Sequence, residues 1–167
     1  MDDERAIVFD LDDTLYPERE YAFSGFDAVA TAFGERLAAT FDLAARMREL
    51  FDTPNRNRVF NVVIEQCGAS DDSLVPEMID VFRNHQPRIH LHADADAALA
   101  RLRPQYKLGI ITDGYAVTQN AKLDALGVRD RVDTVIVTDA WDREFWKPHP
   151  RAFEEMSSRL CVKPEHC

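Results

Sequence analysis

The chain has 167 residues, of which 46% are hydrophobic and 30% charged, a composition typical of a globular protein rather than a disordered one. The formal net charge of −10 argues against nonspecific binding of nucleic acid and against a basic membrane-binding surface. The three cysteines are too few for a disulfide framework, the N-terminus is acidic and no apolar run is long enough to span a membrane. We therefore expect a cytoplasmic protein.

The first predicted element is a strand at 6–9, in which every residue is apolar. Continuous rather than alternating hydrophobicity is typical of a strand buried on both faces of a parallel sheet. Similar runs follow at 108–111, within a predicted strand at 107–112, and at 135–137. Each of the three runs is bounded at its carboxyl end by a short polar residue: Asp10, Thr112 and Thr138. Open α/β sheets build their sites at this end of their strands.

Helical periodicity dominates the segment between the first two strands. Apolar residues at steps of three and four over 23–41 predict one long amphipathic helix. Shorter patterns predict further helices after Asp42, which can serve as an N-cap, from Val59 and after Ser73. We therefore predict a helical insert at 17–88 within a discontinuous core formed by 1–16 and 89–167.

Strands and helices alternate in the rest of the chain. A helical pattern at 95–102 precedes the second strand, and Val117, Ala121 and Ala125 predict the apolar face of the helix that follows it. Gly127 suits the end of that helix, and Pro150 suits the first turn of the last one. This order predicts the α/β class, with a Rossmann-like core in three layers around a parallel sheet.

The densest chemical signal is Asp10-Leu11-Asp12-Asp13-Thr14. Three carboxylates within four positions repel one another unless a cation or backbone donors compensate their charge. A solvated acidic turn is the simplest interpretation. Because the cluster follows a buried strand, however, Asp10 and Asp12 can face one site, which suits a hard cation such as Mg²⁺.

Together with two later motifs, this cluster resembles the haloacid dehalogenase superfamily, and in particular its phosphatases with an early helical cap. The first family motif, Asp-x-Asp-x-Thr, matches residues 10–14. The second, a Thr or Ser that ends the next core strand, matches Thr112, and the third, a Lys often followed by Pro, matches Lys147. The resemblance covers nearly the whole chain and implies a phosphatase for a small phosphorylated metabolite.

Each motif residue has a role that suits phosphoryl transfer. Asp10 can act as a nucleophile that forms an aspartyl-phosphate, and Asp12 can act as the general acid and base. The groups expected to bind phosphate are a hydroxyl, backbone donors and a lysine: Thr112, Asp113, Gly114 and Lys147. The resemblance also implies that Mg²⁺ is held by Asp10 and the main-chain carbonyl of Asp12.

Nothing in the sequence matches the fourth motif of the family, an acidic pair on a Gly-Asp turn that completes the Mg²⁺ site. The chain ends at Cys167, where relatives begin another core strand. We therefore expect a C-terminally truncated chain that lacks the last strands of its sheet and is impaired as a phosphatase. Alternatively, another chain supplies the missing strands.

Three other functions remain open at this stage. Asp12 separates phosphoester chemistry from halide displacement, which needs no acid, but a phosphomutase would share it. A receiver domain that carries a regulatory phospho-aspartate lacks a comparable helical insert, and a non-catalytic interaction module would tolerate the missing motif. The spacing of His85, His90 and His92 is not a recognised zinc pattern. The substrate and the oligomeric state cannot be read from the sequence.

Overall fold

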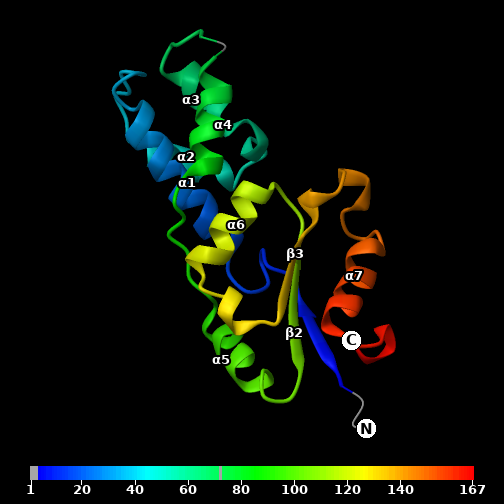
Figure 1. Cartoon of the computed structure of the whole chain (residues 1–167). Helices are drawn as coiled ribbons and strands as arrows, with labels where there is room; N and C mark the ends of the chain where they lie inside the picture. Colours follow the sequence, from blue (N-terminus) through cyan, green and yellow to red (C-terminus); the bar gives the residue numbers. More distant parts are fainter. Residues whose placement is uncertain (1–3, 72) are drawn as a thin grey trace. The chain divides into compact units, whose positions relative to one another are not determined.

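A computed structural model describes residues 4–71 and 73–167. Its contacts divide the chain into two compact units, shown in Figure 1. Unit 1 combines Met1–Glu20 with Arg88–Cys167, and unit 2 is Tyr21–Pro87. Within the described ranges, no helix has both the length and the hydrophobicity needed to cross a lipid bilayer.

Unit 1 contains a parallel sheet of three strands. These are β1 (Ala6–Phe9), β2 (Lys107–Thr112) and β3 (Thr134–Val137), in the order β1-β2-β3. Phe9 pairs with Ile110 and Thr112 with Val137, so the carboxyl ends of the three strands meet at one edge of the sheet. The predicted parallel sheet is confirmed, and the residues that follow its strands are brought to that edge.

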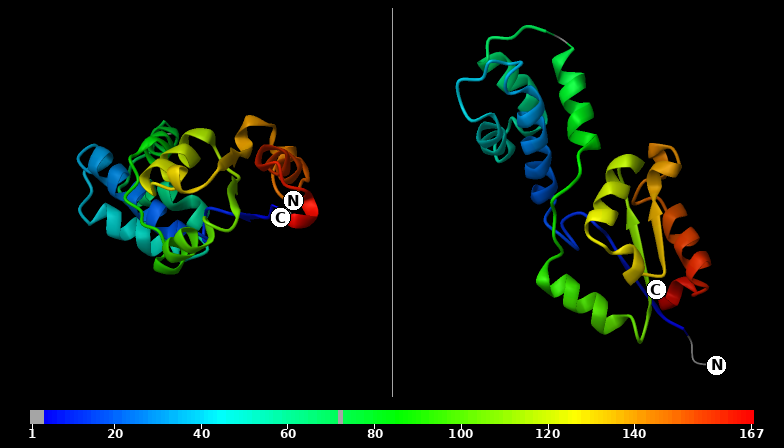
Figure 2. Two further views of the ribbon diagram at one scale, coloured as in Figure 1. Left: turned by 60° about the horizontal axis from the view of Figure 1, so that its bottom comes forward. Right: turned by 60° about the vertical axis from the view of Figure 1, so that its left-hand side comes forward.

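Helices cover both faces of this sheet. Figures 1 and 2 show α5 (Ala93–Leu102) and α6 (Ala116–Ala125) on one side and α7 (Arg151–Leu160) on the other. Gly109 of β2 allows α7 to approach closely, because a Cβ at this position would lie 2.5 Å from the sulfur of Met156. The predicted α/β fold with a three-layer, Rossmann-like core is therefore confirmed. Short 3₁₀ helices occupy parts of the loops: η2 (Arg129–Arg131), η3 (Thr138–Ala140), η4 (Arg143–Phe145) and η5 (Pro164–His166).

Unit 2 is helical. It contains α1 (Glu18–Phe33) from Tyr21 onward, α2 (Leu43–Phe51), η1 (Arg56–Arg58), α3 (Val59–Gln66) and α4 (Leu74–Asn84). The predicted N-cap at Asp42 is confirmed, since its side chain accepts a hydrogen bond of 2.9 Å from the backbone N–H of Ala45. The helices enclose their own apolar core, in which Val29, Met47 and Met78 are completely buried.

The first helix is shorter than its apolar stripe predicts. It ends at Phe33, although Leu37 N–H still bonds to the Phe33 carbonyl at 2.8 Å, as in a further helical turn. Ala38 then adopts a left-handed φ of 46°, and Ala39 N–H bonds back to the carbonyl of Gly34 at 3.2 Å. This is a Schellman motif, which ends a helix by satisfying its last carbonyls. The stripe continues to Phe41 because the loop packs on the same core.

The predicted apolar face of α6 is wrong. Val117 is 51% exposed and Ala125 is exposed, whereas Gln119, Lys122 and Leu123 are buried. The helix therefore turns a glutamine and a lysine toward the interior of unit 1. Burial of these polar side chains is costly unless they find partners, and their partners lie in the predicted site.

Candidate active site

The predicted nucleophile and the predicted lysine are in direct contact. Asp10 follows β1 at the carboxyl edge of the sheet, and Lys147 Nζ donates to Asp10 Oδ1 at 2.6 Å. The same ammonium donates to the Ile111 carbonyl at 3.1 Å. The side chain of Asp10 is 44% exposed and that of Lys147 24% exposed. The fold thus pairs two residues that lie far apart in the sequence and leaves the carboxylate accessible to solvent.

Asp113 fixes the loop that carries this lysine. Its carboxylate accepts the backbone N–H of Lys147 at 3.2 Å and the hydroxyl of Thr138 at 2.7 Å. Thr138 also donates to the Thr112 carbonyl at 3.3 Å. The sequence predicted only backbone donors at Asp113. The structure shows in addition that its side chain holds the loop that carries Lys147.

Asp12 lies in a second cluster, in which both of its carboxylate oxygens are hydrogen-bonded. Oδ1 accepts from the Tyr16 hydroxyl at 2.5 Å and from Lys122 Nζ at 2.6 Å. Oδ2 accepts from Gln119 Nε2 at 2.8 Å. None of these three donors was singled out from the sequence. The sequence feature that could have indicated two of them is a glutamine and a lysine three positions apart, just after the second motif.

Gln119 connects this cluster to the second motif. Its Nε2 group also donates to the hydroxyl oxygen of Thr112, which is completely buried. Gly114 adopts a φ of +128°, and a Cβ there would lie 3.2 Å from Cδ of Gln119. Glycine at this position therefore allows both the backbone conformation and the close passage of the glutamine side chain.

Asp13 shapes the loop between the two predicted catalytic carboxylates and the first helix. It has a left-handed φ of 52°, and its side chain accepts the backbone N–H of Glu18 at 2.8 Å. The Leu11 carbonyl accepts the N–H of Leu15 at 3.0 Å and closes the turn. These bonds hold Asp10 and Asp12 at defined places on either side of a buried leucine.

The side chains gathered in the candidate site offer few ligands for a metal ion. In the ranges 4–71 and 73–167, no three His, Cys, Asp or Glu side chains gather as metal ligands. His85 packs within unit 2 with Nδ1 2.6 Å from the Phe82 carbonyl, and the side chain of His90 is 85% exposed. Asp10 Oδ2 has no protein donor among the residues described, whereas the Asp12 side chain accepts three hydrogen bonds. An exposed carboxylate such as that of Asp10 suits a hard cation such as Mg²⁺.

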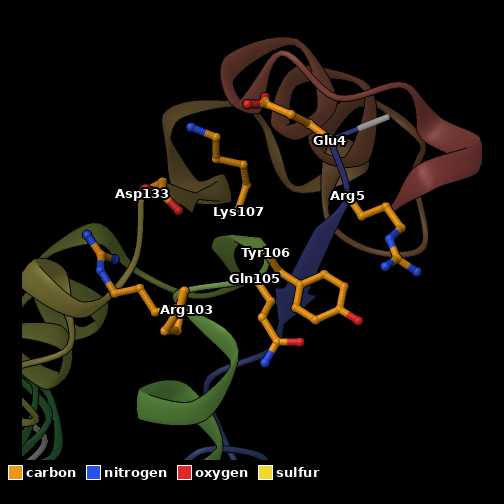
Figure 3. A pocket seen from close by; sticks show the side chains of 8 residues that line it. Glu4, Arg5, Arg103, Gln105, Tyr106, Lys107 and Asp133 are labelled. Carbon is orange, nitrogen blue, oxygen red and sulfur yellow. The ribbon is translucent and has the colours of Figure 1, made fainter. Parts of the chain in front are cut away.

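A cavity of about 420 Å³ lies elsewhere in unit 1 (Figure 3). Arg5, Arg103, Tyr106 and Lys107 contribute to its lining. Arg5 precedes β1 and Lys107 begins β2, so this cavity is at the amino ends of the strands. It is therefore distinct from the residues gathered at the carboxyl edge.

Curated proteins of similar sequence carry phosphatase names. The chain is 30% identical over 170 residues to the glyceraldehyde 3-phosphate phosphatase of Methanopyrus kandleri, covering 96% of this chain and 72% of that protein. It is 29% identical over 169 residues to the protein of the same name from Methanothermobacter thermautotrophicus, covering 96% and 74% respectively.

Solved structures share the fold. The HAD-hydrolase YfnB from Bacillus subtilis, solved with bound magnesium, superimposes with a TM-score of 0.63 at 20% identity, covering 94% of this chain and 72% of that one. A β-phosphoglucomutase-like protein from Thermotoga maritima gives a TM-score of 0.61 at 22% identity, with coverage of 96% and 73%. The family model described as haloacid dehalogenase-like hydrolase matches residues 4–167. The chain therefore belongs to the haloacid dehalogenase-like hydrolase family.

Proposed function

We propose that this protein hydrolyses a small phosphorylated metabolite through an aspartyl-phosphate on Asp10. Its family and its phosphatase-named relatives make it a phosphoric monoester hydrolase. The assignment of roles rests on one observation, that the two carboxylates have different surroundings. Asp10 is accessible and paired with Lys147, while Asp12 is held by three donors of its own.

Asp10 attacks phosphorus in the first step. Lys147 engages Oδ1, so Oδ2 is the oxygen whose lone pair forms the new bond to phosphorus. The bond between phosphorus and the leaving oxygen breaks, and Asp12 transfers a proton to that oxygen, so the product departs as an alcohol. Lys147 offsets the negative charge of the phosphoryl group during the transfer.

Water completes the reaction in the second step. Asp12, now without its proton, takes a proton from a water molecule as that water forms a bond to phosphorus. The bond between phosphorus and Asp10 breaks, which releases inorganic phosphate and restores the carboxylate. Asp12 is then protonated and Asp10 is a carboxylate again, as both were before the first step.

The phosphate is expected to contact the second motif. The backbone N–H groups around Asp113 and Gly114 lie at the turn after β2 and can donate to phosphate oxygens. The hydroxyl of Thr112 accepts from Gln119 and keeps its own hydrogen for donation. Because Thr112 is completely buried, a phosphate oxygen would have to reach the floor of the site to accept that hydrogen.

We propose that Mg²⁺ would be held by the Asp10 carboxylate and the main-chain carbonyl of Asp12, as the family resemblance implies. Magnesium sites commonly use one or two carboxylates together with substrate phosphates, so we expect binding that strengthens when substrate is present. When bound, the ion would reduce the repulsion between the Asp10 carboxylate and the phosphate dianion.

The substrate that we propose is a triose phosphate. The two curated relatives described above are named for glyceraldehyde 3-phosphate, at 30% and 29% identity. In this proposal the helices of residues 17–88 form the cap that selects the substrate. The small number of cysteines supports a cytoplasmic location.

The test compares turnover of glyceraldehyde 3-phosphate and of p-nitrophenyl phosphate, each with and without millimolar Mg²⁺. We expect Asp10→Asn to lower turnover of both at least about a thousandfold, as removal of a covalent nucleophile does. Asp133→Asn is the matched control, because Asp133 accepts the Leu108 N–H near the opposite ends of the strands. Full activity in Asp10→Asn would contradict the reaction, and hydrolysis of the aryl ester alone would contradict only the substrate.

A further inference from the structure

Lys122 is a buried cation to which the proposed reaction assigns no role. It is only 4% exposed, lies on the inner face of α6 and places Nζ 2.6 Å from Asp12 Oδ1. A buried ammonium is unfavourable unless it is paired and hydrogen-bonded. The fold therefore pairs Lys122 with Asp12, in addition to the pair formed by Lys147 and Asp10.

Gln119 approaches the same carboxylate from the same helix. It is 1% exposed and three residues before Lys122, so both side chains project from one helical face. Gln119 Nε2 reaches Asp12 Oδ2 at 2.8 Å, and the Tyr16 hydroxyl adds a bond to Oδ1 from the loop after β1. Donors from two parts of the chain thus fix the plane of the carboxylate.

The number of donors differs between the two oxygens of Asp12. Oδ1 accepts two hydrogen bonds, whereas Oδ2 accepts one among the residues described. A carboxylate oxygen has two lone-pair positions. Oδ2 therefore keeps a position for a further hydrogen, and Oδ1 does not.

We propose that Lys122 and Gln119 are positioning residues that hold Asp12 so that Oδ2 carries the proton exchanged with the leaving oxygen and with water. The inference rests on the proposed function, because it assigns these residues to the acid and base step. Gln119 also donates a hydrogen bond to Thr112, so it holds the Asp12 carboxylate close to the second motif. Neither Lys122 nor Gln119 needs to touch the substrate.

The contact can be tested without turnover by ¹H–¹⁵N spectroscopy of lysine ammonium groups. The chain has four lysines, and a buried, paired ammonium exchanges its protons slowly enough to be observed. The signal that Lys122→Arg removes is expected to shift or vanish in Asp12→Asn and to stay in place in Asp10→Asn. A Lys122 signal that is unchanged by Asp12→Asn would overturn the proposal.

The role of the contact is tested with two aryl esters that differ in their leaving group. Phenol has a pKa of about 10, like the tyrosine side chain, and needs a proton to depart, whereas 2,4-dinitrophenolate does not. We expect Lys122→Met to lower kcat about 10- to 100-fold for phenyl phosphate and less than about threefold for 2,4-dinitrophenyl phosphate, with KM almost unchanged. Lys122→Arg should recover part of the loss, and Lys163→Met, at an exposed lysine, is the matched control.

An equal loss on both esters would indicate a structural role for Lys122 and would overturn the proposal. Gln119→Met provides a second variant if Lys122→Met does not fold, with the same dependence on the leaving group expected. A wild-type chain that hydrolyses neither ester would contradict the proposed function instead. In that event the spectroscopic result still decides whether Lys122 holds Asp12.

Discussion

At the scale of single residues, the two predicted catalytic carboxylates differ in their surroundings. Asp10 has one cationic partner and a side chain that is 44% exposed, whereas the Asp12 side chain is 24% exposed and accepts three hydrogen bonds. A nucleophile needs an approachable lone pair, and an acid needs a fixed orientation toward the leaving group. The surroundings therefore favour Asp10 as the nucleophile and Asp12 as the general acid and base.

Gly114 is a residue at which a small change should lower the stability of the protein. Gly114→Ala would place a side chain at a φ of +128° and 3.2 Å from Gln119, and we expect a loss of about 2–4 kcal/mol in the free energy of unfolding. Gly127→Ala is the control, because its φ is +61° and no atom lies within 4 Å; its expected loss is about 1–2 kcal/mol. Urea unfolding followed by tryptophan fluorescence measures both losses, and an equal or smaller loss in Gly114→Ala would contradict the assigned close contact.

At the scale of elements, the orientation of α6 determines which side chains reach the site. Leu123 is completely buried and Val117 is 51% exposed. We expect Leu123→Ala to lower the free energy of unfolding by about 2–5 kcal/mol. Val117→Ala should change it by no more than about 0.5 kcal/mol. Because Trp141 and Trp146 both belong to unit 1, fluorescence reports this transition, and similar values for the two variants would refute the observed orientation.

The helical unit contains an ion pair that makes its stability depend on pH. Arg36 hydrogen-bonds Glu77 of α4 and thereby lowers the pKa of Glu77 below its ordinary value of 4.5. Hydrogen bonds from the side chain and backbone of Ser73 lower the pKa of Asp71 below 3.8. A carboxyl with a lowered folded-state pKa contributes stability above its unfolded pKa and loses it as pH falls through its folded pKa.

We therefore expect thermal stability of the helical unit to fall as pH is lowered below about 4.5, and to fall less steeply in Glu77→Gln. Circular dichroism at the helical wavelengths measures this effect. Arg36→Leu removes the partner of Glu77 and should flatten the profile in the same way. An unchanged slope in both variants would show that the pair does not contribute.

At the scale of the whole molecule, local patterns predicted much of the architecture. The apolar runs at 6–9 and 108–111 lie in strands, and the family match from residue 4 to 167 spans both units. Periodicity alone misplaced the end of α1, because the stripe to Phe41 continues through a loop on the same core. Hydrophobic patterns do not distinguish a helix from a loop that packs like one.

The candidate site was predictable only in part. Asp10 and Lys147 were predicted from motifs, and the structure brings their side chains into contact at 2.6 Å. Gln119 and Lys122 were missed because an apolar-face rule assigns polar residues of a helix to solvent. Their burial depends on a tertiary partner, Asp12, that lies far away in the sequence.

An aspartyl-phosphate on Asp10 can be detected by rapid acid quenching of the protein during turnover of a phosphate ester, followed by mass spectrometry of its tryptic peptides. We expect the peptide 6–19, which contains Asp10, to gain the mass of one phosphoryl group, and hydroxylamine to remove it. The gain should be absent in Asp10→Asn and present in Lys163→Met. Turnover without any phosphorylated peptide, or a phosphoryl group at another residue, would contradict covalent catalysis by Asp10.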